Sequence, residues 1–229
     1  MNNCRRIFQF FLNLFICSLI LSIQVVYGQS QSGTVTDIDG NQYPIVVIGE
    51  QEWMGENLKV TRFNDGITIP IVTENAGWVK TTSPAYTWYD NEVSNKEIFG
   101  AIYNWYSASS DKLCPTGWRV ATDSDWEILT NQLGGADVAG GKLKETGTKY
   151  WDSPNSNASN ESMFSALPGG YRWSRGKFVE KGMNGYWWSG TECTDTHSWS
   201  RTVNSGNSKI YRTFFIKNKG FSIRCIKEK

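Results

Sequence analysis

Histidine is the scarcest reactive residue in this 229-residue chain, which contains only His197. A zinc site built on imidazoles needs several histidines, and a Ser-His-Asp triad needs a histidine beside a nucleophile and an orienting acid. No Gly-x-Ser-x-Gly sequence, which presents a nucleophilic serine on a tight turn, occurs in the chain. We therefore expect no catalytic constellation and no metal site, and we interpret His197 as a loop residue.

An excess of one charge is also missing, because 23 basic side chains stand against 22 acidic ones and the formal net charge is +1. Nucleic-acid-binding domains carry a clustered basic footprint, so we expect no nucleic-acid partner. The glycine pairs Gly134-Gly135 and Gly169-Gly170 lack the Lys and Ser/Thr that complete a phosphate-binding loop. The sequence therefore predicts no nucleotide and no other cofactor.

Long apolar runs are limited to the N-terminus. Arg5 and Arg6 precede a mostly apolar stretch at 8–23, and a small residue stands before a plausible cleavage point at Gln29. This pattern predicts a signal peptide at 1–28 and a secreted, periplasmic or cell-surface protein without a membrane segment after cleavage. An uncleaved membrane anchor is the alternative, although the run is shorter than the usual ~20 residues of a spanning helix.

Cysteine is sparse, with five in the chain. Cys4 and Cys17 belong to the expected signal peptide, which leaves Cys114, Cys193 and Cys225. In an oxidising compartment, one disulfide and one odd thiol are the simplest arrangement of three cysteines. The residues themselves do not choose the pair, and three free buried cysteines are the alternative.

One domain is expected at 33–229, after a short polar lead of no apparent structure at 29–32, because no repeat or linker-like segment interrupts it. It begins with two strands, at 34–37 and 42–48. Asp39-Gly40-Asn41 joins them, since Gly and Asn tolerate the positive φ of a tight hairpin turn. A third short strand is expected at 52–60.

Two helices should follow. Apolar residues recur at helical spacing over 97–109, and Thr122 with Asp125 resembles the capping box at the start of a second helix, which Gly134-Gly135 ends. A polar surface loop and short strands come afterwards; the loop is expected at 152–162, and the strands around Tyr171, around Phe178 and at 186–189, 198–203, 210–216 and 221–226. Strands, two helices and then many short strands predict an α+β fold.

Seven segments appear in an order that resembles a known family. They are Gly33-Thr-Val-Thr-Asp-Ile-Asp-Gly-Asn41, Glu52-Trp-Met-Gly-Glu-Asn-Leu58, Tyr103-Asn-Trp-Tyr106, Leu113-Cys-Pro-Thr-Gly-Trp-Arg-Val120 with Asp125-Trp126, Leu167-Pro-Gly-Gly170, Gly185-Tyr-Trp-Trp-Ser189 and Ile223-Arg-Cys225. Together they are similar to the Fibrobacter succinogenes major paralogous domain over essentially all of 33–229.

The resemblance implies a C-type lectin-like fold, with small twisted antiparallel sheets, two flanking helices and long loops. It also implies a disulfide between Cys114 and Cys225. The Glu-Pro-Asn, Gln-Pro-Asn and Trp-Asn-Asp sequences with which sugar-binding lectins hold calcium are absent. Calcium-dependent sugar binding is therefore not expected.

Aromatic side chains are abundant, at 14% of the residues, and all eleven tryptophans lie after residue 50. Aromatic and Arg side chains on the loops of such a fold can anchor a ligand. The candidate ligand-binding residues are Trp173, Arg175, Trp187, Asp195, His197, Trp199, Arg201, Asn204, Asn207 and Tyr211. The competing interpretation for Trp187, Trp188 and Trp199 is that these rings fill the core.

These features favour a secreted or surface-associated, non-catalytic binding module that recognises a protein or glycan ligand through its loops. One alternative is a structural component of an envelope or adhesive assembly, in which Cys193 cross-links chains. Another is a carbohydrate-active enzyme that uses two carboxylates, with Glu161, Glu192 and Asp195 as candidates. We expect no enzymatic activity.

Overall fold

The structure, a computed structural model, describes residues 30–229. The expected signal peptide at 1–28 lies outside the described residues. The first strand, β1, already begins at Ser30, so the segment 29–32, which was expected to lack structure, is largely part of a strand. None of the helices in the described part of the chain combines the length and the apolar sequence of a membrane span.

The N-terminal hairpin has the turn that its sequence predicts. β1 (Ser30–Thr36) pairs antiparallel with β2 (Gln42–Ile48). The Asp37 carboxylate closes the turn between them, because its Oδ1 accepts the main-chain N–H groups of Asp39 and Asn41 at 2.9 and 3.0 Å. Local side-chain chemistry therefore fixes this part of the fold.

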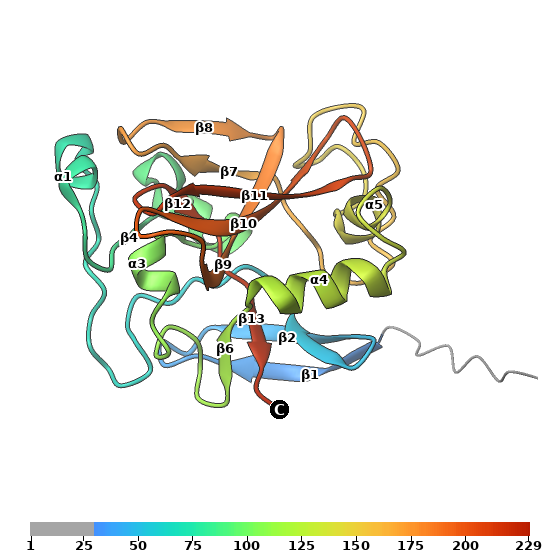
Figure 1. Ribbon diagram of the computed structural model, residues 1–229, viewed down its shortest axis with the longest axis horizontal. Coiled ribbons are helices and arrows are strands. Elements are labelled where there is room, and N and C mark those ends of the chain that lie inside the picture. Colours follow the sequence, from blue (N-terminus) through green and yellow to red (C-terminus); the bar gives the residue numbers. More distant parts are fainter. Residues whose placement is uncertain (1–29) are drawn as a thin grey trace, which may run out of the picture.

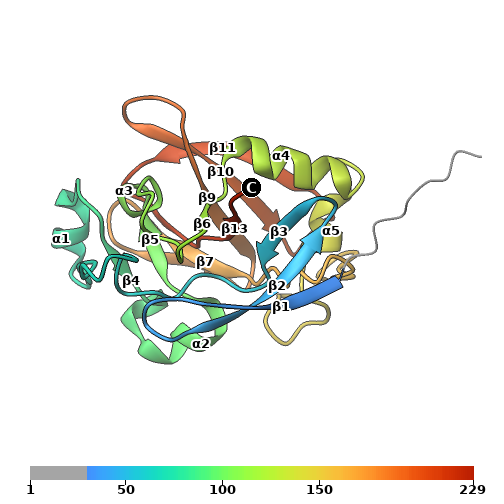
Figure 2. The ribbon, with the colours of Figure 1, turned by 90° about the horizontal axis from the view of Figure 1, so that it is seen from below.

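A five-stranded sheet forms one side of the molecule, in the order β1-β2-β3-β13-β6. Its remaining members are β3 (Gln51–Met54), β6 (Trp118–Val120) and β13 (Cys225–Lys227). A disulfide between Cys114 and Cys225, with the Cα atoms 6.0 Å apart, joins the segment before β6 to β13 and confirms the implied pair. Figure 2 shows this sheet in front, and Figure 1 shows it below the rest of the chain.

The second sheet has the order β11-β10-β9-β7-β12-β5-β4, with β8 paired to β7. Its strands are β4 (Tyr86–Thr87), β5 (Ile102–Asn104), β7 (Gly169–Arg172), β8 (Phe178–Lys181), β9 (Asn184–Glu192), β10 (His197–Asn204), β11 (Ile210–Ile216) and β12 (Gly220–Phe221). The predicted strand at 210–216 is confirmed, whereas the one at 221–226 is divided between the two sheets. The fold is a mixed α+β arrangement, as expected.

The helix expected over 97–109 is wrong. The chain there forms α2 (Lys96–Phe99), then β5, then α3 (Trp105–Ala108). Gly100 ends α2 with a φ of 73°, and the chain then extends to pair with β4 and β12. The apolar spacing of this segment therefore reflects three short elements and not one helical face.

The second expected helix is confirmed as α4 (Asp123–Gln132). Thr122 and Asp125 form a reciprocal capping box, and the N–H of Gly135 bonds to the carbonyl of Thr130 beyond the last turn. The remaining helices are short: α1 (Asn75–Lys80), α5 (Ala139–Leu143) and two 3₁₀ turns, η1 (Tyr89–Asn91) and η2 (Val93–Asn95).

Two apolar clusters fill the interior. The first lies between the sheets and includes the disulfide, with Trp118 from one sheet and Trp188 and Phe221 from the other. The second surrounds Trp126 of α4. Nine of the eleven tryptophans are buried, so only Trp173 and Trp199 offer a ring to solvent. The high tryptophan content is thus mainly a property of the core.

Candidate functional site

Strands β10 and β11 carry one exposed and two half-buried rings on one side of their hairpin. His197 lies opposite Ile216 and Trp199 lies opposite Phe214 in the antiparallel register, so these side chains share one face of the sheet. Both the His197 and the Trp199 rings meet Phe214 edge-on, with centroids 5.7 Å apart. Phe214 is 51% exposed and Ile216 is 40% exposed. We call these four residues, together with Arg212, the aromatic face.

Arg212 is fixed at one end of this face by two contacts. Its guanidinium lies 3.3 Å from the centroid of the Trp199 ring, and its Nη2 is 2.9 Å from Oδ2 of Asp123, the first residue of α4. Asp123 also binds Nη1 of Arg201 at 2.7 Å. Burial alone would raise the pKa of Asp123, but hydrogen bonds from Arg212 and Arg201 hold that pKa below its ordinary value. The carboxylate therefore stays charged and positions both guanidinium groups.

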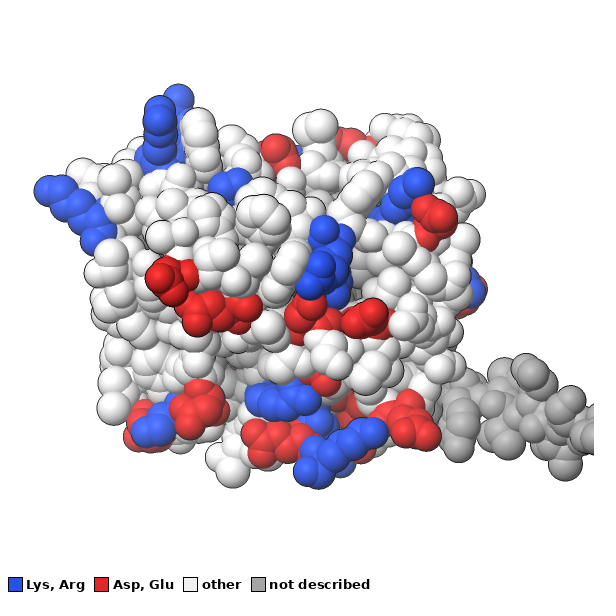
Figure 3. All heavy atoms as spheres, in the orientation of Figure 1, with Lys and Arg blue, Asp and Glu red and all other residues white. Residues whose placement is uncertain are grey.

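A groove of about 400 Å³ continues from Arg212 along α4. Glu127, Thr130 and Asn131 of α4 form one wall, and Ile210 and Arg212 belong to the other. Figure 3 shows basic and acidic side chains gathered near the start of α4, beside a mostly uncharged area over β10 and β11. The surface thus offers apolar contact on the strands and polar groups toward the helix.

Two of the expected ligand-binding residues are buried, which corrects the sequence interpretation. Trp187 is 1% exposed, and its Nε1 donates to Oδ1 of Asn57 at 2.8 Å. Its strand, β9, turns this ring toward Trp126 in the second apolar cluster. Arg201 is 3% exposed and is committed to Asp123. The Trp187 ring is therefore inaccessible to a ligand in this conformation, whereas Arg201 only borders the groove along α4.

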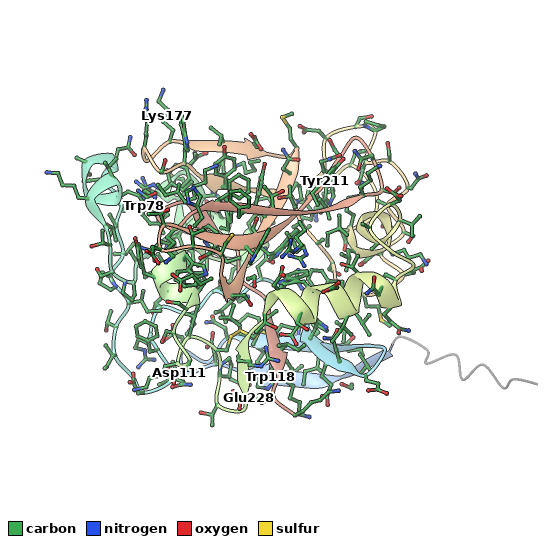
Figure 4. All side chains as sticks on the ribbon, viewed as in Figure 1. Trp78, Asp111, Trp118, Lys177, Tyr211 and Glu228 are labelled. Carbon is green, nitrogen blue, oxygen red and sulfur yellow. A yellow bond between two sulfur atoms is a disulfide. The ribbon has the colours of Figure 1, made fainter. Side chains whose placement is uncertain are left out.

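Trp173 and Arg175 are exposed but lie elsewhere. They belong to the turn between β7 and β8, where the Arg175 guanidinium is 5.4 Å from the Trp173 ring centroid. Figure 4 labels Lys177, from the same turn, well apart from Tyr211 of β11. The sequence therefore grouped residues that the fold separates.

The other expected ligand-binding residues lie at the two ends of the β10–β11 hairpin. Asn204 accepts two main-chain N–H groups in the connecting turn, and Asn207 Nδ2 donates to the Tyr211 hydroxyl at 2.9 Å. Tyr211 alternates with Arg212 along β11, so it lies on the opposite side of the sheet from the aromatic face. Asp195 lies in the exposed turn before β10, where its carbonyl accepts a hydrogen bond from Nζ of Lys217.

Arg212, Phe214 and Ile216 were missed in the sequence interpretation. The strand itself was expected, and its alternation of residues would have placed these three side chains on one side. Their pairing with His197 and Trp199 depends on the β10–β11 register, which no turn motif of this hairpin specified.

Two of the three carboxylates considered for glycoside hydrolysis are engaged in separate ion pairs. Glu161 binds Lys142 at 2.9 Å, and Glu192 binds Lys217. Within residues 30–229, no group of three or more His, Cys, Asp or Glu side chains is placed to hold a metal ion. Cys193 is a half-buried free thiol at the end of β9.

Two other hollows lie away from the aromatic face. One, of about 290 Å³, has Glu56, Glu97 and Glu145 among its lining residues and the buried Arg224 beside them. The other is an open groove of about 710 Å³ along the C-terminal strand, lined in part by Arg119 and Gln132. Neither contains a residue that the sequence had assigned to ligand binding.

Comparison with known proteins gives one match. The model of a family described as the Fibrobacter succinogenes major domain covers residues 46–227, within the 33–229 expected from the resemblance. No curated protein and no solved structure matches the chain.

Proposed function

We propose that this chain, which belongs to the Fibrobacter succinogenes major domain family, is a secreted or surface-associated binding module with a C-type lectin-like fold. It recognises a protein or glycan ligand without catalysis. The observation that carries the proposal is the aromatic face, where exposed Phe214 and Ile216 adjoin a guanidinium held by Asp123.

The chemistry of this face suits a binding surface. Aromatic and Arg side chains contribute most to the affinity of protein interfaces, because each can bury a large area at the centre of the contact. Arg212 is already oriented by Asp123 and Trp199, so little further ordering is needed when a ligand binds. The adjoining groove along α4 extends the contact beyond the strands.

The proposed export and the proposed lectin-like fold rest on different observations. The N-terminal sequence pattern supports secretion, and the Cys114–Cys225 disulfide is consistent with an oxidising compartment. Two sheets, short helices and long connecting loops are compatible with a lectin-like arrangement.

Glycan and protein arrays probed with the purified chain test the proposal. We expect the arrays to identify a ligand. The Phe214→Ala variant should bind this ligand at least about tenfold more weakly than the wild-type chain, because an anchor side chain at an interface contributes on the order of 2 kcal/mol. Trp173→Ala is the matched control, since it removes another exposed ring, 39% accessible, far from the aromatic face. The Trp173→Ala variant should bind the ligand with the same affinity as the wild-type chain.

Two results would overturn the proposal. One is the absence of any ligand on both arrays. The other is turnover of a polysaccharide that is abolished by Glu192→Gln and retained in Phe214→Ala, which would favour the carbohydrate-active alternative.

A further inference from the structure

Strand β11 is one edge of the second sheet, and it is unusually apolar for an edge. It pairs with β10 on one side and with no strand of the described residues on the other. Tyr211, Phe214 and Ile216 are all among the exposed large hydrophobic residues. Such an edge is a template for pairing with another strand.

The hydrogen bonds of the neighbouring strands show which main-chain groups of β11 face outward. The N–H of Trp188 bonds to the carbonyl of Ser222, so it points away from β10. Trp188 lies opposite Ser200 of β10, so the main-chain groups of Ser200 point away from β9 and toward Thr213 of β11. The Ser200 hydroxyl also donates to the Thr213 carbonyl. The N–H and C=O groups of Arg212 and Phe214 therefore face away from the sheet.

Each end of this edge already has one main-chain group bonded to another segment. The N–H of Ile210 bonds to the carbonyl of Ala136, and the carbonyl of Ile216 accepts the N–H of Lys219. Between them, Arg212 and Phe214 have no protein partner for their outward main-chain groups in the described part of the chain. The free edge thus consists of two residues that flank Thr213.

The strand carries few of the features that usually block edge pairing. Ile210–Ile216 contains no proline and no lysine, which are residues that natural edges use to prevent association. Its single charge, Arg212, is neutralised by Asp123 of the same chain. A neighbouring strand would therefore meet little electrostatic repulsion.

We propose that a second copy of this chain pairs with it, β11 against β11, in an antiparallel dimer whose two-fold axis passes beside Thr213. In this register Arg212 of each copy lies opposite Phe214 of the other. Each opposed pair exchanges two N–H···O=C bonds, so all the free main-chain groups of both residues are satisfied. The sheet then continues across the two copies.

The side chains of the strand complement themselves in the same register. Tyr211 faces Phe215 of the second copy, and Thr213 faces Thr213. Aromatic pairs and Thr–Thr pairs are both favourable across strands. This self-complementarity is the reason for choosing a second copy rather than an unrelated peptide as the occupant.

The dimer also joins the two aromatic faces. Arg212, Phe214 and Ile216 lie on the same side of the sheet in both copies, so the two faces form one continuous surface across the axis. A ligand with repeated epitopes would be held at two sites, which raises its apparent affinity without any new contact. This consequence rests on the proposed function, whereas the dimer itself does not.

The mass of the chain in solution is the first test. Analytical ultracentrifugation from 1 to 200 µM is done in a Cys193→Ser background, which excludes dimers linked through that thiol. We expect a concentration-dependent shift to twice the mass. Phe214→Lys should weaken the dimer at least about tenfold, because the two-fold axis repeats each lost contact and sets Lys opposite Arg212. Ile128→Lys on α4, also at a 51% exposed residue, is the matched control and should dimerise normally.

A cross-link provides the second test and remains informative if Phe214→Lys folds poorly. Directly opposed residues in a pair without main-chain hydrogen bonds have Cα atoms about 4.5 Å apart, which is within the range for a disulfide. The variant Cys193→Ser/Thr213→Cys should therefore oxidise to a covalent dimer on non-reducing gels. Cys193→Ser/Thr194→Cys, in an exposed turn, should stay monomeric.

Three outcomes would overturn the dimer. They are a monomeric mass at every concentration, equal dimerisation by Phe214→Lys and the wild-type chain, and equal cross-linking at Thr194 and Thr213. Success on the ligand arrays with failure here would leave the binding function standing and remove only the dimer.

Discussion

Three buried cations are bound mainly by main-chain oxygens, and no carboxylate of residues 30–229 lies within bonding distance of them. Lys144 is fully buried, and its Nζ donates to the carbonyls of Ser156, Asn204 and Asn207 at 2.9 Å each. Arg172 donates to the carbonyls of 72, 73 and 176. Arg224 binds three main-chain carbonyls as well, in addition to the Asn57 side chain. Each cation therefore connects segments distant in sequence.

Replacing Lys144 by Met should lower the free energy of unfolding by about 2 to 4 kcal/mol, because three buried carbonyls lose their donor. Urea unfolding would measure the change. Lys142→Met, two residues earlier in α5, is the control: it removes a half-exposed ion pair with Glu161 and should change stability by less than about 1 kcal/mol. Equal effects of the two substitutions would contradict the role given to Lys144.

The same lysine predicts a dependence on pH. Burial lowers the pKa of Lys144 from 10.5 to about 8. Between these values the unfolded chain binds a proton that the folded chain does not, so stability rises with pH. The unfolding free energy of the wild-type chain, relative to Lys144→Met, should therefore be lowest below pH 8 and increase toward pH 10. Urea unfolding at several pH values would measure this difference in unfolding free energy. The same difference at every pH in this range would contradict the prediction.

At the scale of elements, Gly100 separates α2 from β5 and gives the clearest packing constraint. A Cβ at this position would lie 2.7 Å from Cβ of Asn57 and 2.8 Å from the carbonyl oxygen of Leu58, at a φ of 73°. Gly100→Ala should thus cost about 3 kcal/mol or more, since strain and overlap act together.

Gly66→Ala provides the comparison for that prediction. Gly66 has a φ of 90°, but nothing lies within 4 Å of its added Cβ. This substitution isolates the backbone strain, which is worth about 1 kcal/mol. Thermal unfolding that gave equal losses for the two variants would show that the contact with Asn57 has no effect.

Elements with local determinants could be predicted from the sequence. The Asp37 turn and the Thr122–Asp125 capping box are each set by side chains within four residues, and both are confirmed. The 97–109 segment failed because the pairing of β5 with β4 and β12 overrides its apolar spacing. Pairing between segments so far apart leaves no local pattern to interpret.

The candidate site, like the fold, could be predicted only in part from the sequence. Composition and the resemblance directed attention to the later strands, where His197 and Trp199 do lie together. The sequence could not show that Trp187 faces inward, because β9 is buried on both sides by α4 and by the first cluster. It also could not show that Phe214 completes the face, since that depends on register.

At the scale of the whole molecule, the Cys114–Cys225 disulfide closes a loop of 111 residues in sequence separation. A closure of this length constrains the unfolded chain and is worth about 4 to 5 kcal/mol. We expect Cys114→Ser/Cys225→Ser to lose about that much stability in urea. Cys193→Ser, which removes a free thiol, should lose less than about 1 kcal/mol. A loss below about 1 kcal/mol in the double variant would contradict the expectation.

The way in which the buried cations bind also bears on how such a protein can diverge. Main-chain oxygens are the same whatever side chains a loop carries, so Lys144 and Arg172 can hold loops of many different sequences on one path. Substitutions can then accumulate at Ser156 or Thr73 while the course of the chain is kept. A duplicated copy of the gene would inherit a fixed scaffold together with segments free to acquire new specificities.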